Sequence, residues 1–132
     1  MGKLIVIEGL DGCGKSTQLE MLYNRMQKEG IASKEVSFPN YDSKACEPVK
    51  MYLAGEFGTD VNSVNAYAAS VFYAVDRYAS FKTDWGKNYN ENEVILCGRY
   101  VTSNNIHQCS KLSESEWESF SDWLVDFEYN KM

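Results

Sequence analysis

Blocks of apolar and polar residues divide the chain into short strands and amphipathic helices. Leu4 to Ile7 is a continuous apolar run of the kind found in a buried parallel strand. Helical spacing follows in the apolar residues Leu19, Leu22, Tyr23 and Met26. Gly30 suits the position just after a helix. Further strands are predicted at Lys34 to Phe38 and at Val94 to Cys97.

The remaining segments have the pattern of helices and turns. Pro48 opens a short helix over residues 48–53, and a longer helix rich in alanine, valine and aromatic residues runs from about Ser63 to Phe81. The polar turn "NYNENE" precedes the third strand, and another helix follows Tyr100. Ser113 and Glu116 form a capping-box pattern in front of an apolar helical face. That face consists of Phe120, Trp123, Leu124 and Phe127.

The order of these elements predicts the fold class. Strands alternate with helices, which is typical of an α/β protein with a parallel sheet. The 132 residues are enough for one domain with a substantial core, and the sequence contains no internal repeat, low-complexity segment or linker. We therefore expect a single domain over residues 1–132.

The segment between the first strand and the first helix carries the strongest chemical signal. Gly9 to Ser16 reads G-x-x-x-x-G-K-S, the phosphate-binding loop pattern. Its glycines let the backbone turn sharply, so that loop N–H groups and the positive end of the next helix converge on phosphate oxygens. Lys15 supplies a mobile positive charge for the β and γ phosphates, and Ser16 offers a hydroxyl to Mg²⁺. The loop is therefore expected to hold a nucleoside triphosphate.

Composition narrows the classes of function. The net charge of −6 disfavours electrostatic binding of nucleic acid or of an anionic membrane. No apolar run reaches the length of a membrane span, and the N-terminus lacks the apolar region of a signal peptide. The four cysteines form no C-x-x-C pair and there is one histidine, which argues against a zinc site or a disulfide framework. We expect a cytoplasmic protein with a small-molecule substrate and no nucleic-acid or membrane partner.

Aromatic and arginine residues after the predicted strands indicate which molecule accepts the terminal phosphate of the bound nucleoside triphosphate. The chain has no N-K-x-D motif of a GTPase, and "VILCG" ends in glycine rather than in the Asp-Glu pair of an ATPase motor. Instead, "SFPNY" follows the second strand, "FYAVDRY" lies on the long helix, and "GRYVTSNNIHQ" follows the third strand. Ligands bind at the carboxyl ends of parallel strands, where an arginine can grip a monophosphate and an aromatic ring can hold a base. The pattern favours phosphoryl transfer to a second nucleotide.

At these residues the chain resembles the thymidylate kinase family, the P-loop nucleoside monophosphate kinases that make dTDP from dTMP and ATP. The resemblance is greatest to Firmicutes-type bacterial members. It covers nearly the whole chain, because "IEGLDGCGKSTQ", "FPNY", "VKMYLAGEFG", "FYAVDRYASFKTDWGK" and "RYVTSNNIHQ" occur in family order. It implies the three-layer α/β fold of P-loop NTPases, ATP and Mg²⁺ as cofactors, dTMP as substrate, a place in dTTP biosynthesis, and a homodimer formed through the long helix. An unusual load of apolar residues on that helix also favours the dimer, namely Val64, Tyr67, Val71, Phe72 and Val75.

The resemblance assigns a role to each matching residue. The phosphate loop would hold the ATP phosphates and Mg²⁺, and the hydroxyl of Ser16 would bind the metal. The loop consists of Gly9, Leu10, Asp11, Gly12, Cys13, Gly14, Lys15, Ser16 and Thr17. Asp11 would also bind the 3′-hydroxyl of dTMP, and Arg99 would grip its phosphate. The base would be contacted by Phe38, Tyr73, Arg77, Asn104 and Gln108. Lys15, Arg99 and Asp11 are the expected catalytic residues, because in-line transfer needs positioning and charge neutralisation rather than a covalent intermediate.

Several of these residues also have a purely structural alternative. The family role of Tyr73 is to stack on thymine, yet Tyr73 could equally be a core residue of an apolar helix. Arg77 would bind a carbonyl of the base, or else form a helical ion pair. Phe38 would line the base site, or else be a core residue at the end of a strand. The sequence alone leaves these alternatives open.

Two departures from the family pattern bear on activity. Gly98 stands where family members carry an aspartate before the Arg-Tyr pair, and the chain ends at "DFEYNKM", before the family's arginine-bearing lid and further strands. Both are expected to lower the rate of phosphoryl transfer and the stability of the chain. Two alternatives to a working dTMP kinase therefore stay open: a catalytically impaired nucleotide-binding fragment, and a deoxynucleoside kinase. A phosphate clamp at Arg99 argues against the second, because a nucleoside has no phosphate to clamp.

Overall fold

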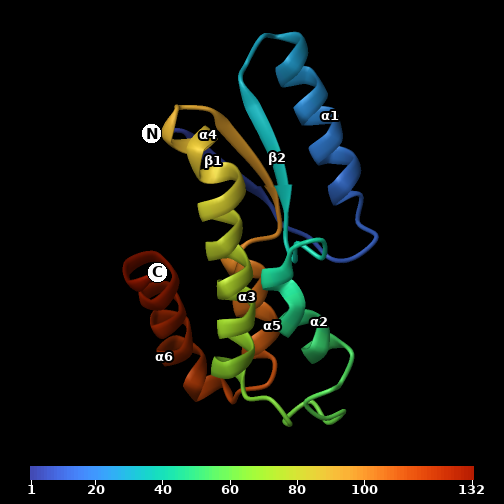
Figure 1. The fold of residues 1–132 in the computed structure, drawn as a ribbon. Helices are drawn as coiled ribbons and strands as arrows, with labels where there is room; N and C mark the ends of the chain where they lie inside the picture. The colour runs from blue at the N-terminus through green and yellow to red at the C-terminus, as the bar shows by residue number, and fades with distance from the viewer. The chain divides into compact units, whose positions relative to one another are not determined.

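The computed structural model describes all of residues 1–132, which form two compact units. Unit 1 comprises Met1–Phe38 and Ala79–Tyr100, and unit 2 comprises Pro39–Tyr78 and Val101–Met132. Figure 1 labels the elements, which are described here one unit at a time. The expectation of a single domain stays a prediction.

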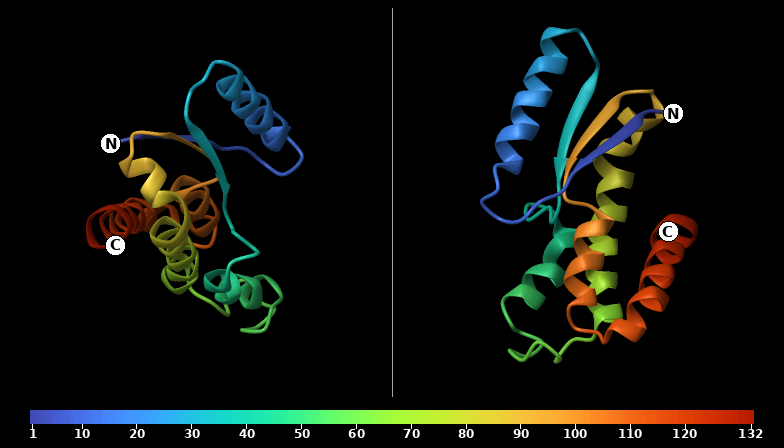
Figure 2. Two further views of the ribbon diagram at one scale, coloured as in Figure 1. Left: turned by 45° about the horizontal axis from the view of Figure 1, so that its top comes forward. Right: turned by 180° about the vertical axis from the view of Figure 1, so that it is seen from behind.

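Unit 1 contains a parallel sheet with its strands in the order β1, β3, β2. Strand β1 spans Lys3–Ile7, β2 spans Ser33–Ser37 and β3 spans Val94–Gly98. The three strands run side by side in the right-hand view of Figure 2. Ile7 and Ser37 both pair with Gly98, so all three strands end at one level. The predicted α/β fold with a parallel sheet is confirmed.

Helices cover both faces of this sheet, which gives unit 1 three layers. Ile95 and Cys97 of the central strand point to one face, where an apolar cluster packs against the π-helical turn Phe81–Trp85 and helix α4, Gly86–Asn90. The cluster consists of Leu4, Val6, Val36, Phe38, Phe81, Trp85, Tyr89, Ile95, Cys97 and Tyr100. Because strand side chains alternate, Leu96 and Gly98 face the other side, which α1, Lys15–Lys28, covers. Central-strand residues 95–97 are fully buried as a result.

The long helix differs from its predicted bounds for identifiable local reasons. Helix α3 spans Ala66–Ser80 and begins three residues later than expected, because the side chain of Asn65 caps it by accepting the N–H of Ala68 at 2.9 Å. The helical path then continues past the predicted end at Phe81 through the π-helical turn into α4. Gly86 permits this turn, since a Cβ there would lie 2.3 Å from the carbonyl oxygen of Phe81. Residues 88–90 of "NYNENE" are therefore helical, and the turn begins at Glu91.

Unit 2 consists of helices. They are α2, Glu47–Leu53, α3 as far as Tyr78, α5, Val101–Cys109, and α6, Glu114–Val125, which continues as a π-helical segment, Asp126–Lys131. The predicted capping box is confirmed, because the Glu116 carboxylate accepts the backbone N–H of Ser113 at 3.1 Å. Phe120 and Leu124 are fully buried, and the rings of Trp123 and Phe127 stack at 5.2 Å. The predicted apolar face of α6 thus packs inside unit 2.

None of these helices combines the length and the apolar character that crossing a membrane requires. The four cysteines are present as free thiols.

One carboxylate is buried within unit 2. Asp76 on α3 is only 1% exposed, and its Oδ2 accepts the backbone N–H of Asn40 at 2.8 Å. The thiol of Cys46 also bonds to it. Burial raises the pKa of Asp76, although these two hydrogen bonds and the charge of Arg77 oppose the rise. Asp76 therefore ties the loop after Phe38 to α3.

We predict that replacing Asp76 with asparagine changes how stability depends on pH. The folded chain binds the Asp76 proton more tightly than the unfolded chain does, so the free energy of unfolding falls as pH rises from the ordinary carboxyl pKa of 3.8 to the raised folded value. Asp76→Asn keeps an acceptor for Asn40 without this titration. The variant should gain stability relative to the native chain as pH increases over that interval. Urea unfolding followed by tryptophan fluorescence at several pH values measures the difference, and parallel pH profiles would contradict the prediction.

Candidate functional site

The phosphate loop lies in unit 1 between β1 and α1. Gly12 and Gly14 have φ angles of 75° and 89°, in the left-handed region that favours glycine. A Cβ at either position would meet no atom within 4 Å, so it is the backbone conformation that calls for glycine there. Lys15 is the first residue of α1, and its Nζ donates to the carbonyl oxygen of Gly9 at 3.4 Å. The lysine side chain thus folds back over the loop, as a phosphate-binding lysine must.

The other loop residues are open to a ligand. Exposed side chains or backbone are found at Leu10, Asp11, Gly12, Cys13, Gly14, Ser16 and Thr17. Ser16 and Thr17 belong to the first turn of α1, where backbone N–H groups have no partner within the helix. The loop can therefore present N–H groups, the ammonium of Lys15 and a hydroxyl to phosphate oxygens and a metal.

Arg99 lies at the same edge of the sheet as this loop. It follows β3 directly and has a φ of 64°, a conformation that non-glycine residues rarely adopt. Its backbone N–H donates to the carbonyl oxygen of Ile7 at 3.2 Å. Its guanidinium forms an ion pair with the carboxylate of Asp11 in the loop. Two predicted catalytic residues, from segments 88 residues apart in the sequence, are therefore in contact.

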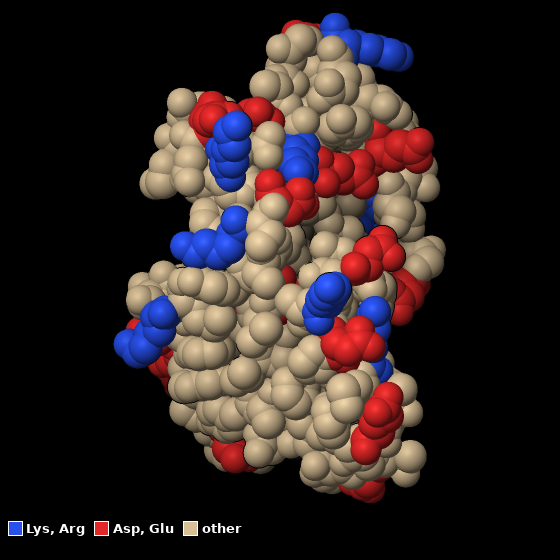
Figure 3. Space-filling model, viewed as in Figure 1, with Lys and Arg blue, Asp and Glu red and all other residues tan.

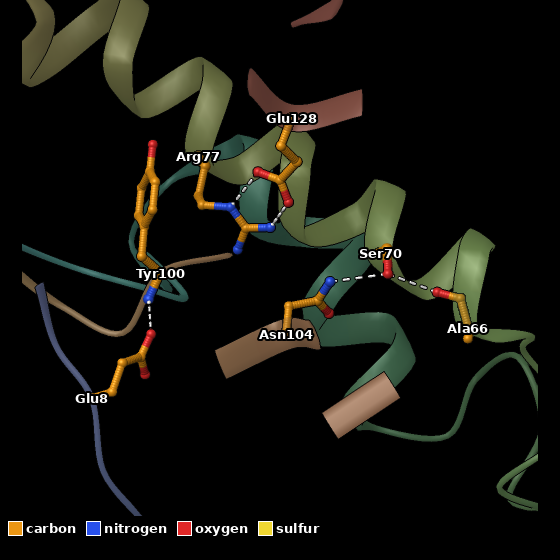
Figure 4. Close-up of polar contacts among 7 residues, drawn as sticks. All are labelled: Glu8, Ala66, Ser70, Arg77, Tyr100, Asn104 and Glu128. Carbon is orange, nitrogen blue, oxygen red and sulfur yellow. Dashed lines mark hydrogen bonds and ion pairs between the residues drawn. The ribbon is translucent and has the colours of Figure 1, made fainter. Parts of the chain in front are cut away.

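Glu8 helps to hold this unusual backbone. Its carboxylate accepts the backbone N–H of Tyr100 at 2.9 Å, next to Arg99 (Figure 4). Together with the bond from Arg99 to Ile7, this joins the end of β3 to the end of β1. The phosphate-loop pattern assigns no role to Glu8. Its position directly after an apolar strand is nevertheless typical of a polar residue at the ligand-binding edge of a parallel sheet.

Gly98 is the last residue of β3 and is buried. A Cβ at this position would lie 2.8 Å from Cδ1 of Leu19 and 3.4 Å from Oγ of Ser37. An aspartate at position 98 would therefore have to displace the buried side chain of Leu19, which is 3% exposed. The neighbours of position 98 in α1 and β2 thus leave little room for the aspartate that the resemblance implies there.

Phe38 packs as a core residue of unit 1. It is 4% exposed, belongs to the cluster with Ile95 and Trp85, and its ring lies 5.9 Å from that of Tyr100. The contacts match the structural alternative that the sequence left open. A contact of Phe38 with a base stays a prediction.

The remaining predicted site residues lie in unit 2 on α3 and α5. Asn104 donates from Nδ2 to the hydroxyl of Ser70 at 2.9 Å, and Ser70 donates in turn to the carbonyl oxygen of Ala66 at 2.7 Å (Figure 4). This leaves Oδ1 of Asn104 buried without a hydrogen-bond partner, and Oε1 of Gln108 one turn later is in the same condition. A buried acceptor without a donor costs about 1–3 kcal/mol. A water molecule or a ligand can supply such a missing donor.

Arg77 is held by a residue that sequence reasoning missed. Its Nε donates to Oε2 of Glu128 at 2.8 Å, and its Nη2 donates to Oε1 of the same carboxylate (Figure 4). The two residues are 51 positions apart, so no local pattern indicates the pair. The contact resembles the structural alternative that the sequence left open, an ion pair of Arg77, but the carboxylate comes from the segment after α6 rather than from α3. A contact of Arg77 with a base stays a prediction.

Tyr73 is half-buried beside these residues. Its ring makes an edge contact with that of Tyr52 at 6.4 Å. Burial raises the pKa of Tyr73 to about 12, and the nearby phenols of Tyr52 and Tyr41 add to the rise. The phenol is therefore neutral at physiological pH. Positions 70, 73 and 77 share one face of α3, because they are three and four residues apart.

The structure thus groups the predicted site residues by unit. Unit 1 brings together the phosphate loop, Asp11 and Arg99, an arrangement of cations and N–H groups suited to phosphates. Unit 2 contains Tyr73, Arg77, Asn104 and Gln108, which offer a ring, a guanidinium and two amide acceptors. Those groups suit a planar ligand with both N–H and carbonyl functions.

Comparison with known proteins agrees with this chemistry. A family model described as thymidylate kinase matches residues 7–124, which is most of the chain. A thymidylate kinase of Mycobacterium tuberculosis is 32% identical over 98% of this chain, and one of Halothermothrix orenii is 28% identical over 95%. This chain covers 59% of each of those two relatives, so it spans little more than half of their length.

Solved structures of the family share the fold. A thymidylate kinase from Candida albicans aligns with a TM-score of 0.71 at 24% identity, covering 94% of this chain and 56% of that chain. A thymidylate kinase from Ehrlichia chaffeensis aligns with a TM-score of 0.66 at 20% identity, covering 95% and 66% respectively. With the family model matching nearly the whole length and the fold shared, the chain belongs to the thymidylate kinase family.

Proposed function

We propose that this chain binds ATP and dTMP and transfers the γ-phosphate of ATP to dTMP, giving dTDP. The observation that carries the proposal is the contact of Arg99 with Asp11 of the phosphate loop. A second fixed cation beside the loop suits a second phosphate, which a nucleotide acceptor has and which water or a nucleoside lacks. Family membership supports the same reaction.

The donor side of the proposed reaction rests on the phosphate loop. The loop N–H groups and the N-terminus of α1 would bind the phosphates of ATP, and Lys15 would neutralise charge on the β and γ phosphates. Mg²⁺ fits here, because it is usually bound by one or two protein oxygens together with phosphate oxygens. Ser16 supplies a hydroxyl in the exposed first turn of α1, and Asp11 supplies an exposed carboxylate. The metal would contribute charge neutralisation on the transferring phosphoryl group.

We predict that Lys15→Ala weakens binding of ATP in the presence of Mg²⁺. Losing a charge-assisted contact to the phosphates should raise the dissociation constant at least about tenfold. Lys28→Ala is the matched control, because Lys28 lies exposed at the other end of the same helix. Isothermal titration calorimetry compares the three proteins. Equal affinity in the native chain and Lys15→Ala would refute the donor site.

On the acceptor side, Arg99 would grip the phosphate of dTMP and Asp11 would bind its 3′-hydroxyl. The contact between these two residues would hold the guanidinium next to the loop before the acceptor binds. Transfer would then proceed in line, without a covalent intermediate, by positioning and charge neutralisation.

We predict that Arg99→Ala weakens binding of dTMP but leaves binding of thymidine unchanged. The variant should lose about tenfold or more in affinity for dTMP, since a charge-assisted contact is removed, and should bind thymidine as the native chain does. Arg25→Ala is the control, because Arg25 is exposed and forms a local ion pair at 2.8 Å with Glu29, the residue that follows α1. Competition titrations give both constants. An equal loss for thymidine would favour the deoxynucleoside kinase alternative.

The base of dTMP would be recognised by the residues of unit 2. The imide N–H of thymine can supply the donor that Oδ1 of Asn104 lacks, and Arg77 can donate to a carbonyl of the base. Tyr73 would stack on the ring, and Gln108 would contribute a second amide acceptor. Cytosine lacks the imide N–H and carries an amino group in place of one carbonyl, so dCMP should bind less well.

An assay of dTDP formation from ATP and dTMP tests the proposed activity. The alternative acceptors dCMP, dGMP, dAMP and thymidine are measured in the same assay. Preference for a purine nucleotide would refute the proposal.

We also propose that the chain forms a homodimer through α3. Tyr67, Val71, Val75 and Tyr78 recur along one side of the helix and are between 37% and 41% exposed. Figure 3 shows mostly uncharged surface over this helix. Apolar residues in such a stripe favour a self-complementary interface of two identical helices. The cytoplasmic location and the absence of nucleic-acid partners stay predictions.

We predict that Val71→Glu converts the dimer to a monomer. A charge at the centre of the stripe would be buried without a partner in the interface. Val125→Glu is the control, because Val125 is 50% exposed and belongs to α6 rather than to α3. Sedimentation velocity at micromolar concentration measures the state of each protein. A native chain that sediments as a monomer would contradict the proposal.

A further inference from the structure

The ammonium of Lys111 joins three segments of unit 2. Lys111 lies just after α5, where its backbone N–H donates to the carbonyl oxygen of Gln108 at 3.0 Å. Its Nζ donates to the hydroxyl of Tyr52 on α2 at 2.5 Å. The same Nζ donates to the carbonyl oxygen of Val64, just ahead of α3, at 3.4 Å. One side chain thus ties the end of α5 to α2 and to the segment that leads into α3.

Helix stability and charge pairing do not account for these contacts. A cation near the end of a helix interacts favourably with the helix dipole, but it can do so from water. Lysine usually keeps its ammonium in water, whereas both contacts of the Lys111 ammonium are partly buried. The two acceptors are neutral oxygens, so no opposite charge in these contacts offsets the cost of desolvation. What the contacts do achieve is to fix the ring of Tyr52.

The ring of Tyr52 contacts Tyr73, one of the residues expected at the base. The two rings meet edge to face, with centroids 6.4 Å apart and an angle of 89° between their planes. Tyr52 also packs on the adjacent ring of Phe72 at 6.3 Å. The hydroxyl of Tyr73 forms no hydrogen bond within the chain, so packing sets the orientation of its ring. Lys111, Tyr52 and Tyr73 therefore form a continuous chain of contacts within unit 2.

We propose that Lys111 is a positioning residue for the acceptor nucleotide: by fixing Tyr52, it holds the ring of Tyr73 in the orientation that stacks on the pyrimidine of dTMP. The inference rests on the proposed function, in which Tyr73 stacks on thymine. Stacking requires the two rings to be nearly parallel, and a ring that can tilt must be ordered when the nucleotide binds. A ring that is ordered in advance avoids that cost, so affinity rises although Lys111 adds no contact of its own.

The test compares affinities for dTMP and ATP in five proteins: the native chain, Lys111→Met, Tyr52→Phe, the double variant of these two, and Lys50→Met. Lys111→Met removes the ammonium, and Tyr52→Phe removes its acceptor but keeps the ring. Lys50→Met is the matched control, because Lys50 lies on α2 and forms an exposed ion pair with Glu47 at 3.1 Å. Calorimetry gives both affinities, and urea unfolding shows that each protein is folded under the conditions of the titration.

Lys111→Met and Tyr52→Phe should each raise the dissociation constant for dTMP about threefold or more and leave that for ATP unchanged. The double variant should lose no more affinity than either single variant, because both changes break the same contact. Lys50→Met should behave as the native chain. A side chain that only stabilises the fold would lower the free energy of unfolding without changing the affinity of the folded protein. Native affinity for dTMP in folded Lys111→Met, or losses that add in the double variant, would overturn the proposal.

A measurement on the native chain covers the case in which the variants do not fold. Titration with dTMP should shift the NMR resonances of the Tyr73 ring and of the Tyr52 ring together, since the two rings are in contact. A shift of Tyr73 with Tyr52 unchanged would overturn the proposal. If the native chain binds ATP but not dTMP, the proposed function fails and this inference fails with it. If dTMP binds and its affinity survives Lys111→Met, only the inference fails.

Discussion

The register of the parallel sheet is the constraint on which unit 1 depends. Because Ile7 and Ser37 both pair with Gly98, the three strands end at one level and release their loops at one edge. That register lets the N–H of Arg99 reach the carbonyl oxygen of Ile7 and the N–H of Tyr100 reach Glu8. A shift of one residue would break both bonds and would turn the buried side of β3 around. The chemistry of the phosphate loop and of Arg99 therefore follows from hydrogen bonds within the sheet.

Unit 2 depends on buried polar groups instead of a sheet. Asp76, Arg77, Asn104 and Gln108 are all 5% exposed or less, although such side chains are rarely buried. Three of the four have a partner inside the unit: Asp76 binds the N–H of Asn40, Arg77 binds Glu128, and Asn104 binds Ser70. The acceptors left over on Asn104 and Gln108 reduce stability. Both acceptors belong to residues that the sequence predicted for the base site, and that assignment stays a prediction.

Local patterns in the sequence predicted the features that depend on interactions within a few residues of the chain. The apolar run of β1, the glycines of the phosphate loop and the capping box at Ser113 each act within a few residues, and each is present as expected. The bounds of α3 were less predictable, because its start depends on a cap by Asn65 and its continuation on a close backbone approach at Gly86. Glu128 could not be found at all, since its partner is 51 residues away and no periodicity joins them.

The packing around Gly98 explains why a glycine stands at this position. A Cβ at this position would lie 2.8 Å from Cδ1 of Leu19, so the aspartate that the resemblance implies there would compete with the packing of α1 on β3. In this chain α1 instead approaches the end of the central strand closely. The carboxylates at this edge are then Glu8 and Asp11, both of which come from the segment after β1. Negative charge at this edge thus comes from the phosphate-loop side, where Asp11 holds Arg99. The orientation of Arg99 therefore depends on the loop itself. On the proposed function, the loop that would bind a triphosphate would also present the arginine to the second phosphate.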